Sequence, residues 1–167
     1  CIGLQNKRDL IEMEFNFKEH LKGLPEYCRL IPVKGKVPTE SDWRHNTYTL
    51  DEVCTKTKSG VGQVLGELGN GVAALDCDGL NHEENFEHHF GRSISDLPKT
   101  IAFTSGTPHR HQRLLKVPEA FWIDIKHKIL EKDNCAPVEL RWTGQSVIAG
   151  KHPSGRNYQW LKGCSPS

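Results

Sequence analysis

The sequence predicts an α+β fold built on a mixed or antiparallel sheet. Three observations lead to this prediction. Helical and extended segments are interspersed along the chain, apolar runs of strand length end at glycine turns, and two pairs of extended segments are each joined by a short turn. Helices would then cover one face of the sheet, and the other face would be free to carry chemistry.

The first third of the chain is expected to contribute two helices and a strand. In residues 7–21 apolar side chains recur at helical spacing and predict an amphipathic helix. These side chains are Leu10, Met13, Phe17 and Leu21. A short strand over 29–33 leads to a loop over 34–38. Thr49 and Glu52 have the spacing of a capping box and predict a helix through Val53.

The middle of the chain contains the most apolar strand. Residues 61–68 lead into a glycine turn at 69–71, and the apolar run at 72–75 predicts a buried strand that ends at Asp76. Asn81 and Glu84 again have capping spacing, which predicts a helix that carries Phe86 and Phe90.

Two hairpins and a helix are expected in the last part. Residues 99–104 and 109–117 read as strands joined by a turn at 105–108. Pro118 suits the first position of a helix with Phe121, Ile125 and Ile129 on its inner face. Residues 138–142 and 146–149 predict a hairpin around Thr143 and Gly144.

Composition limits the class of protein. The chain has 167 residues, the size of one ordinary domain, and no apolar run approaches the roughly 20 residues that span a bilayer. A net charge of +1 provides no strong field for nucleic acid. The six cysteines form no C-x-x-C pair, and no signal peptide begins the chain, so we expect a cytoplasmic location, no membrane contact and no zinc-binding cysteine cluster.

Asp76 and Asp78 are the clearest candidates for chemistry. One residue separates them at the end of the apolar strand, so both side chains leave the same face of the sheet. Like charges this close repel each other, and a fold retains them mainly where a cation compensates. Oxygen ligands suit Mg²⁺ or Mn²⁺. The alternative is a solvated pair of acids with turn roles.

A second candidate is the turn at Ser105 and Gly106, which runs into a strand. On that strand His109 and His111 point one way and Arg110 the other. Backbone amides in a turn followed by His and Arg suit phosphate oxygens, although a plain polar hairpin explains them too.

Glu139 is the third candidate, because an acid in an otherwise apolar strand is expected to be paired or metal-bound. It would supply a third carboxylate to the acidic pair. Arg141, two residues on and on the same face, is the alternative partner.

A series of motifs carries a family resemblance. The series is Ile31-Pro-Val-Lys-Gly-Lys-Val-Pro38, Val61-Gly62, Val72-Ala-Ala-Leu-Asp-Cys-Asp-Gly79, Thr104-Ser-Gly with Arg110-His111, Val138-Glu-Leu-Arg141, and His152-Pro-Ser-Gly155 through Tyr158-Gln-Trp160. Over roughly residues 30–161 the chain resembles the bifunctional primase-polymerase domain of the archaeo-eukaryotic primase superfamily.

The resemblance implies an RRM-like catalytic sheet with a smaller N-terminal α/β element. It also implies a template-directed nucleotidyltransferase, a DNA primase, a DNA polymerase or both, that works with two divalent ions. Asp76, Asp78 and Glu139 match the metal-binding acids, the last position being more often Asp in the family. The residues expected at the nucleotide phosphates are Ser105, Gly106, Arg110 and His111, with His109 as the fallback, and further candidates for phosphate contacts are Lys34, Lys36, His152 and Arg156.

The expected partners are a DNA template and primer and nucleoside triphosphates. Residues 1–29 are expected to form a helical extension and residues 30–167 the catalytic domain. The chain ends read as those of a fragment, so a helicase or another replication domain is expected in the parent protein.

Two other functions compete with this one. A non-catalytic RRM-like module for single-stranded nucleic acid would stack bases on Phe103, Trp142 and Trp160, but it leaves the acids unexplained. A zinc hydrolase would use the His-rich stretch 82–89, whose spacing departs from H-E-x-x-H because the next histidine after His82 is His88.

Overall fold

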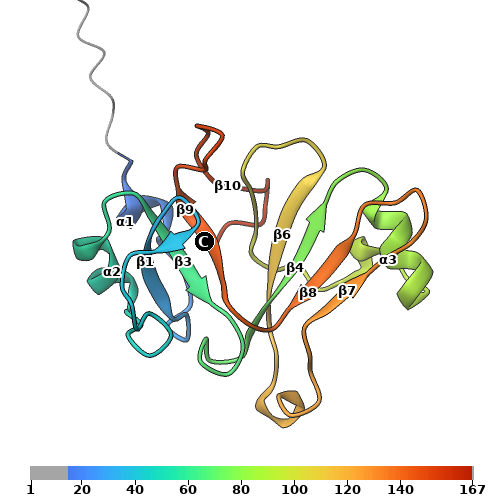
Figure 1. The fold of residues 1–167 in the computed structure, drawn as a ribbon, viewed down its shortest axis with the longest axis horizontal. Helices are drawn as coiled ribbons and strands as arrows, with labels where there is room; N and C mark the ends of the chain where they lie inside the picture. The colour runs from blue at the N-terminus through green and yellow to red at the C-terminus, as the bar shows by residue number, and fades with distance from the viewer. Residues whose placement is uncertain (1–14, 167) are drawn as a thin grey trace, which may run out of the picture.

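Two antiparallel sheets form the framework of the protein. The computed structural model describes residues 15–166 and places a four-stranded sheet beside a six-stranded one, with helices on their outer sides (Figure 1). The strand orders are β2-β1-β3-β9 and β10-β5-β6-β4-β8-β7, and all the pairings are antiparallel. The predicted α+β class is confirmed.

The four-stranded sheet is the smaller element and packs against two helices. Its strands are β1 (Leu30–Lys34), β2 (Val37–Pro38), β3 (Gly60–Val64) and β9 (Gln145–Gly150). The helices are α1 (Phe17–His20) and α2 (Leu50–Lys56). The predicted capping box of Thr49 and Glu52 begins α2, and Val53 of this helix lies in the core with Leu21.

The six-stranded sheet carries the acidic strand. Its members are β4 (Val72–Asp78), β5 (Ala102–Thr104), β6 (Arg110–Lys116), β7 (Lys128–Leu130), β8 (Val138–Arg141) and β10 (Gln159–Trp160). Helix α3 (His82–Phe90) and the short 3-10 helix η1 (Ile94–Asp96) cover its outer face.

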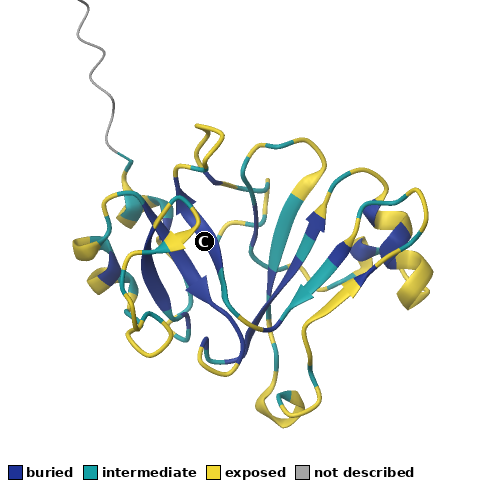
Figure 2. Cartoon of the chain, in the orientation of Figure 1, coloured by how far each residue is buried: buried dark blue, intermediate teal, exposed yellow. Residues whose placement is uncertain are grey.

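Strand β4 divides its side chains between two cores. Val72 and Ala74 pack in the larger core with the four-stranded sheet, whereas Leu75 and Cys77 pack under α3. Figure 2 shows that buried residues follow β1, β3, β9 and β4, while the loops and the outer side of α3 are exposed. Because side chains alternate along a strand, Asp76 continues the inner face of Val72 and Ala74.

Two predicted helices need correction. Only Phe17–His20 is helical within the described part of the expected helix over 7–21, and residues 7–14 lie outside the described residues. After Pro118 the chain forms only the 3-10 turn η2 (Glu119–Phe121) and then β7. Phe121 and Ile129 are 58% and 54% exposed, so a longer helix would lack the packing that stabilises helices.

The predicted hairpin over 138–149 is also wrong, because its two strands belong to different sheets. β8 pairs with β4 and β7, and β9 pairs with β3. At the corner between them, the Arg141 guanidinium donates to the Gln145 carbonyl at 3.0 Å and to Ser146 Oγ at 3.2 Å. These bonds hold the chain as it crosses to the other sheet instead of turning back.

The cap expected at Asn81 is absent, although the helix after it forms. Asn81 has a left-handed backbone and makes no side-chain cap bond, and its amide donates to the Asn134 carbonyl instead. Among residues 15–166, no helix combines the length and apolar character needed to cross a bilayer.

Candidate nucleotide and metal site

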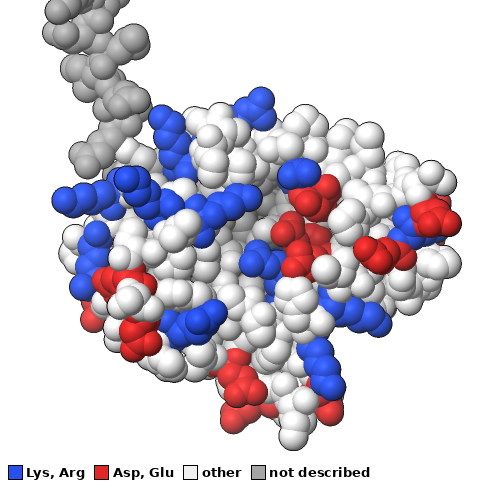
Figure 3. All heavy atoms as spheres, in the orientation of Figure 1, with Lys and Arg blue, Asp and Glu red and all other residues white. Residues whose placement is uncertain are grey.

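Three carboxylates meet on the inner face of the six-stranded sheet. Asp76 and Asp78 lie on β4, and Glu139 on β8 pairs directly with Asp76. Side chains of directly paired residues leave the same face of a sheet, so all three acids share the inner face. Figure 3 shows acidic atoms gathered over β4 and β8 at the edge of a hollow, opposite basic atoms over the four-stranded sheet.

Asp76 is the most perturbed of these acids. Burial, followed by the nearby charges of Asp78 and Glu139, raises its pKa from 3.8 to about 6. Arg141 and a 2.7 Å hydrogen bond from the Gln112 amide to Asp76 Oδ2 oppose the increase. The pKa of Asp76 is therefore raised mainly because the carboxyl is buried, and its acidic neighbours add to this increase.

The other two acids each have a basic neighbour. Arg110 Nε lies 3.1 Å from Asp78 Oδ1. Glu139 Oε1 lies 2.8 Å from His127 Nε2 and 3.9 Å from Arg141 Nε. Arg141 therefore does pair with Glu139 as the alternative interpretation expected, but it does so inside the acidic cluster.

Basic and polar groups border the same hollow, some from β6 beside the acids and others from outside that strand. Its lining includes Lys36, Ser105, Arg110, Gln112, His152 and Tyr158 together with Asp76 and Asp78. Partial burial, followed by Lys36 and Arg110, lowers the pKa of His152. Since His152 Nδ1 accepts the Ser154 backbone N–H at 3.1 Å, its other ring nitrogen carries the proton of the neutral ring and can donate.

Hydrogen bonds within and around it hold the turn at Ser105 and Gly106 in place. The Gly106 N–H donates to Thr104 Oγ1 at 3.0 Å, and the Thr104 hydroxyl donates to the Arg110 carbonyl at 2.7 Å. Gly106 has φ +80, and its carbonyl accepts a bond from the Arg156 guanidinium. This arrangement places Arg156 next to the turn and ties the turn to Arg110 at the start of β6.

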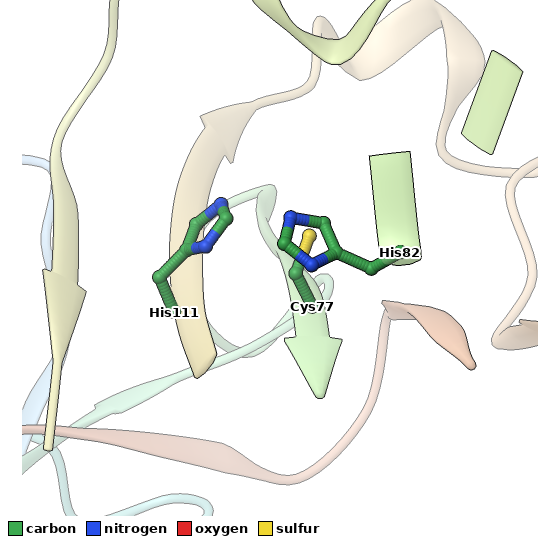
Figure 4. A group of neighbouring side chains, drawn as sticks. All are labelled: Cys77, His82 and His111. Carbon is green, nitrogen blue, oxygen red and sulfur yellow. The ribbon is translucent and has the colours of Figure 1, made fainter. Parts of the chain in front are cut away.

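His111 does not turn its ring toward the acids. It pairs with Cys77, so it shares the outer face of the sheet, and its ring packs edge to face against His82 with centroids 5.1 Å apart (Figure 4). Burial, followed by His82 and Arg113, lowers its pKa to about 4. His109 precedes β6 in a left-handed conformation. The strand residues that face the acids are Arg110 and Gln112.

Lys34 also lies apart from the acids. It lines a separate basic hollow with Lys58 and Lys151, which Phe15 and Phe17 border. The sequence interpretation missed Gln112, His127 and Tyr158 as neighbours of the acids. For Gln112 a signal existed, because it lies two residues after Arg110 on the same strand face.

The three acids supply the kind of ligand that a hard divalent cation takes. Carboxylate oxygens from Asp76, Asp78 and Glu139 form an oxygen donor set of the kind that Mg²⁺ and Mn²⁺ prefer. Asp78 and Glu139 add to the increase in the Asp76 pKa although each has a basic neighbour, and a bound cation would relieve their repulsion of Asp76.

Comparison with known proteins identifies one family. The model of the family described as bifunctional DNA primase/polymerase, N-terminal, matches residues 24–167. Comparisons with curated proteins and with solved structures gave no match.

Proposed function

The chain belongs to the family of bifunctional DNA primase/polymerase N-terminal domains, and from this premise we propose that it is a template-directed nucleotidyltransferase that adds nucleoside triphosphates to a DNA strand. Membership supports a primase or polymerase activity in general. One observation carries the specific proposal: three carboxylates share one sheet face, and two of them, Asp76 and Asp78, line a hollow together with Lys36, Arg110 and His152.

Asp76, Asp78 and Glu139 are the proposed metal ligands. Bound Mg²⁺ or Mn²⁺ supplies Lewis-acid activation of the attacking 3′-hydroxyl and neutralises the triphosphate charge. The amide of Gln112 fixes the orientation of the Asp76 carboxylate through its 2.7 Å hydrogen bond. His127 and Arg141, whose nitrogens lie 2.8 and 3.9 Å from Glu139 Oε1, restrain the Glu139 carboxylate.

The triphosphate is proposed to lie against the basic wall of the hollow. Arg110 and Lys36 contribute positive charge, and the neutral His152 ring donates a hydrogen bond. Arg110 already pairs with Asp78 at 3.1 Å, and we expect its guanidinium to move to the phosphates when a cation replaces it at the carboxylate. Ser105 and Gly106 would contribute hydroxyl and backbone groups from the turn.

The DNA partner is proposed to run along the four-stranded sheet. There Lys34, Lys58 and Lys151 line a wide hollow with Phe15 and Phe17, a combination of cations and aromatic rings suited to phosphates and unstacked bases.

Residues 30–167 would act as the catalytic unit and 1–29 as an extension. A helicase or other replication domain in the parent protein, and a cytoplasmic location, belong to the same proposal.

Primer extension tests this proposal. The native chain is expected to extend a primer on a DNA template only when Mg²⁺ or Mn²⁺ is present. Asp78→Asn should lower the rate by at least about a hundredfold, because a metal ligand is lost. Asp133→Asn, a change at an exposed acid distant in sequence, is the matched control and should extend normally.

DNA binding by the same variants separates catalysis from binding. Fluorescence anisotropy with a labelled primed template is expected to change little in Asp78→Asn. If the native chain binds DNA but incorporates neither ribo- nor deoxyribonucleotides with either ion, the nucleotidyltransferase proposal fails, and the chain is a non-catalytic binding module.

A further inference from the structure

A second group of metal-ligating side chains lies behind the acidic strand. Cys77, His82 and His111 come from β4, the start of α3 and β6, and one ligand atom from each lies within 4.8 Å of the others. Figure 4 shows the thiol and both imidazole rings turned toward one another. Cys77 and His82 are only 0% and 8% exposed.

The two histidines present ring nitrogens without partners. Nε2 of His82 and Nε2 of His111 are both buried, and neither atom has a hydrogen-bond partner within residues 15–166. Buried polar atoms in native proteins almost always have a partner, so unpaired nitrogens in one cluster require an explanation. A bound metal ion supplies one.

The surroundings of His82 favour a ligand role. Its Nδ1 lies 2.7 Å from the Gly79 carbonyl, and because a carbonyl only accepts, Nδ1 carries the proton. The lone pair is then on Nε2, the nitrogen with no other partner. A backbone carbonyl that holds the far nitrogen of an imidazole is the usual outer support of a metal-bound histidine.

We propose that Cys77, His82 and His111 bind one Zn²⁺ ion that joins β4, β6 and α3 on the face of the sheet opposite the acidic cluster. One thiolate and two imidazoles are the donor set that Zn²⁺ prefers, with water as the fourth ligand. On binding, Cys77 releases its thiol proton to solvent and forms the Zn–S bond. Because the acids lie on the other face of the sheet, the ion would link β4, β6 and α3 without taking part in the proposed nucleotidyl transfer.

Cobalt spectroscopy distinguishes this site from the acidic cluster. Co²⁺ bound through Cys77 gives a thiolate-to-cobalt charge-transfer band in the near ultraviolet, whereas the oxygen ligands of Asp76, Asp78 and Glu139 cannot. The native chain, produced with zinc, is expected to retain about one zinc ion per chain by mass spectrometry after dialysis. It should also give the band after exchange to Co²⁺.

Matched variants identify the ligands. His82→Ala and Cys77→Ser should reduce retained zinc to below about a tenth of an equivalent and remove the band. His88→Ala and Cys135→Ser, a histidine of the same helix and a cysteine outside the cluster, should leave both unchanged. Asp76→Asn should also keep the band, which makes the result independent of the polymerase proposal.

A stability measurement covers the case of a variant that does not fold. A strong chelator should lower the melting temperature of the native chain but not that of His82→Ala, or of His82→Gln if the alanine variant is insoluble. The proposal is overturned if the native chain retains no zinc and gives no band with Co²⁺, or if both signals persist in the His82 and Cys77 variants.

Discussion

Replacing Asp76 with asparagine should make the metal-free protein more stable at neutral and alkaline pH. Burial and the neighbouring Asp78 and Glu139 raise the pKa of Asp76 from 3.8 to about 6. Above that pH the folded protein holds a carboxylate that the unfolded chain would ionise more easily. Asn removes the charge and keeps the shape of the side chain, so a substitution that abolishes catalysis should stabilise the fold.

The magnitude follows from the same pKa. A difference of about 2 at about 1.4 kcal/mol per pKa unit corresponds to about 3 kcal/mol. The hydrogen bond from Gln112 to Asp76 already lowers this pKa, so the loss of its charge-assisted part is included in that figure. The gain in the free energy of unfolding is therefore about 3 kcal/mol, or about 6–12 °C in melting temperature for a chain of this size.

The pH dependence has a defined sign. Between about pH 4 and pH 6 the folded state binds more protons at Asp76 than the unfolded state does, so this carboxyl lowers native stability as pH rises through that window. Below about pH 4 the carboxyl is neutral in both states. The advantage of Asp76→Asn should therefore disappear at low pH and be complete above about pH 6.

Thermal unfolding in chelator-containing buffer at several pH values measures this effect, with Asp133→Asn as the exposed control. Mg²⁺ or Mn²⁺ should raise the melting temperature of the native chain and have a smaller effect on Asp76→Asn. The reasoning is refuted if Asp76→Asn melts below the native protein at about pH 8, or if its advantage is equal at about pH 4 and pH 8.

Three further substitutions have defined expectations. Lys36→Ala should raise the KM for the incoming nucleotide in primer extension by about tenfold, because one charged phosphate contact is lost. Lys34→Ala should change this KM by less than about twofold. Equal effects of the two substitutions would count against the proposed position of the triphosphate. Gly66→Ala should lower the free energy of unfolding in urea by more than about 2 kcal/mol. Gly66 has φ +76, and an added Cβ would lie 2.1 Å from the Trp142 carbonyl oxygen. Near-native stability of this variant would show that the corner between the sheets is not rigid. Thr49→Ala should cost about 1 kcal/mol in the same assay with primer extension unchanged, through loss of the α2 cap; a neutral result would mean that packing alone holds α2.

Local signals in the sequence predicted the acidic strand well. An apolar run ending at Asp76 and Asp78 specified a buried strand, and its period of two placed both acids on one face. The capping box at Thr49 predicted α2 for a similarly local reason, since both partners lie within one turn. Such features depend only on residues close in sequence.

Pairings between distant segments were not predictable in the same way. The sequence showed that Arg110 and His111 leave opposite faces of a strand, but it did not show which face meets the acids. That choice depends on the register between β6 and β4, which pairs Cys77 with His111. The error at 138–149 has a similar origin, because β8 pairs with β4, a strand more than sixty residues earlier in the chain, and not with its neighbour β9.

The register of β6 on β4 is therefore the feature on which both faces of this sheet depend. A slip of one residue would turn Arg110 and Gln112 away from Asp78 and Asp76 and bring the neutral His111 ring to the acids. Strand alternation alone does not prevent such a slip, since β6 is polar through Arg113 and only Leu114 is deeply buried. A zinc ion held by Cys77 and His111 would fix this pairing from behind, and loss of that ion should reduce primer extension even though its ligands lie on the face opposite the acids.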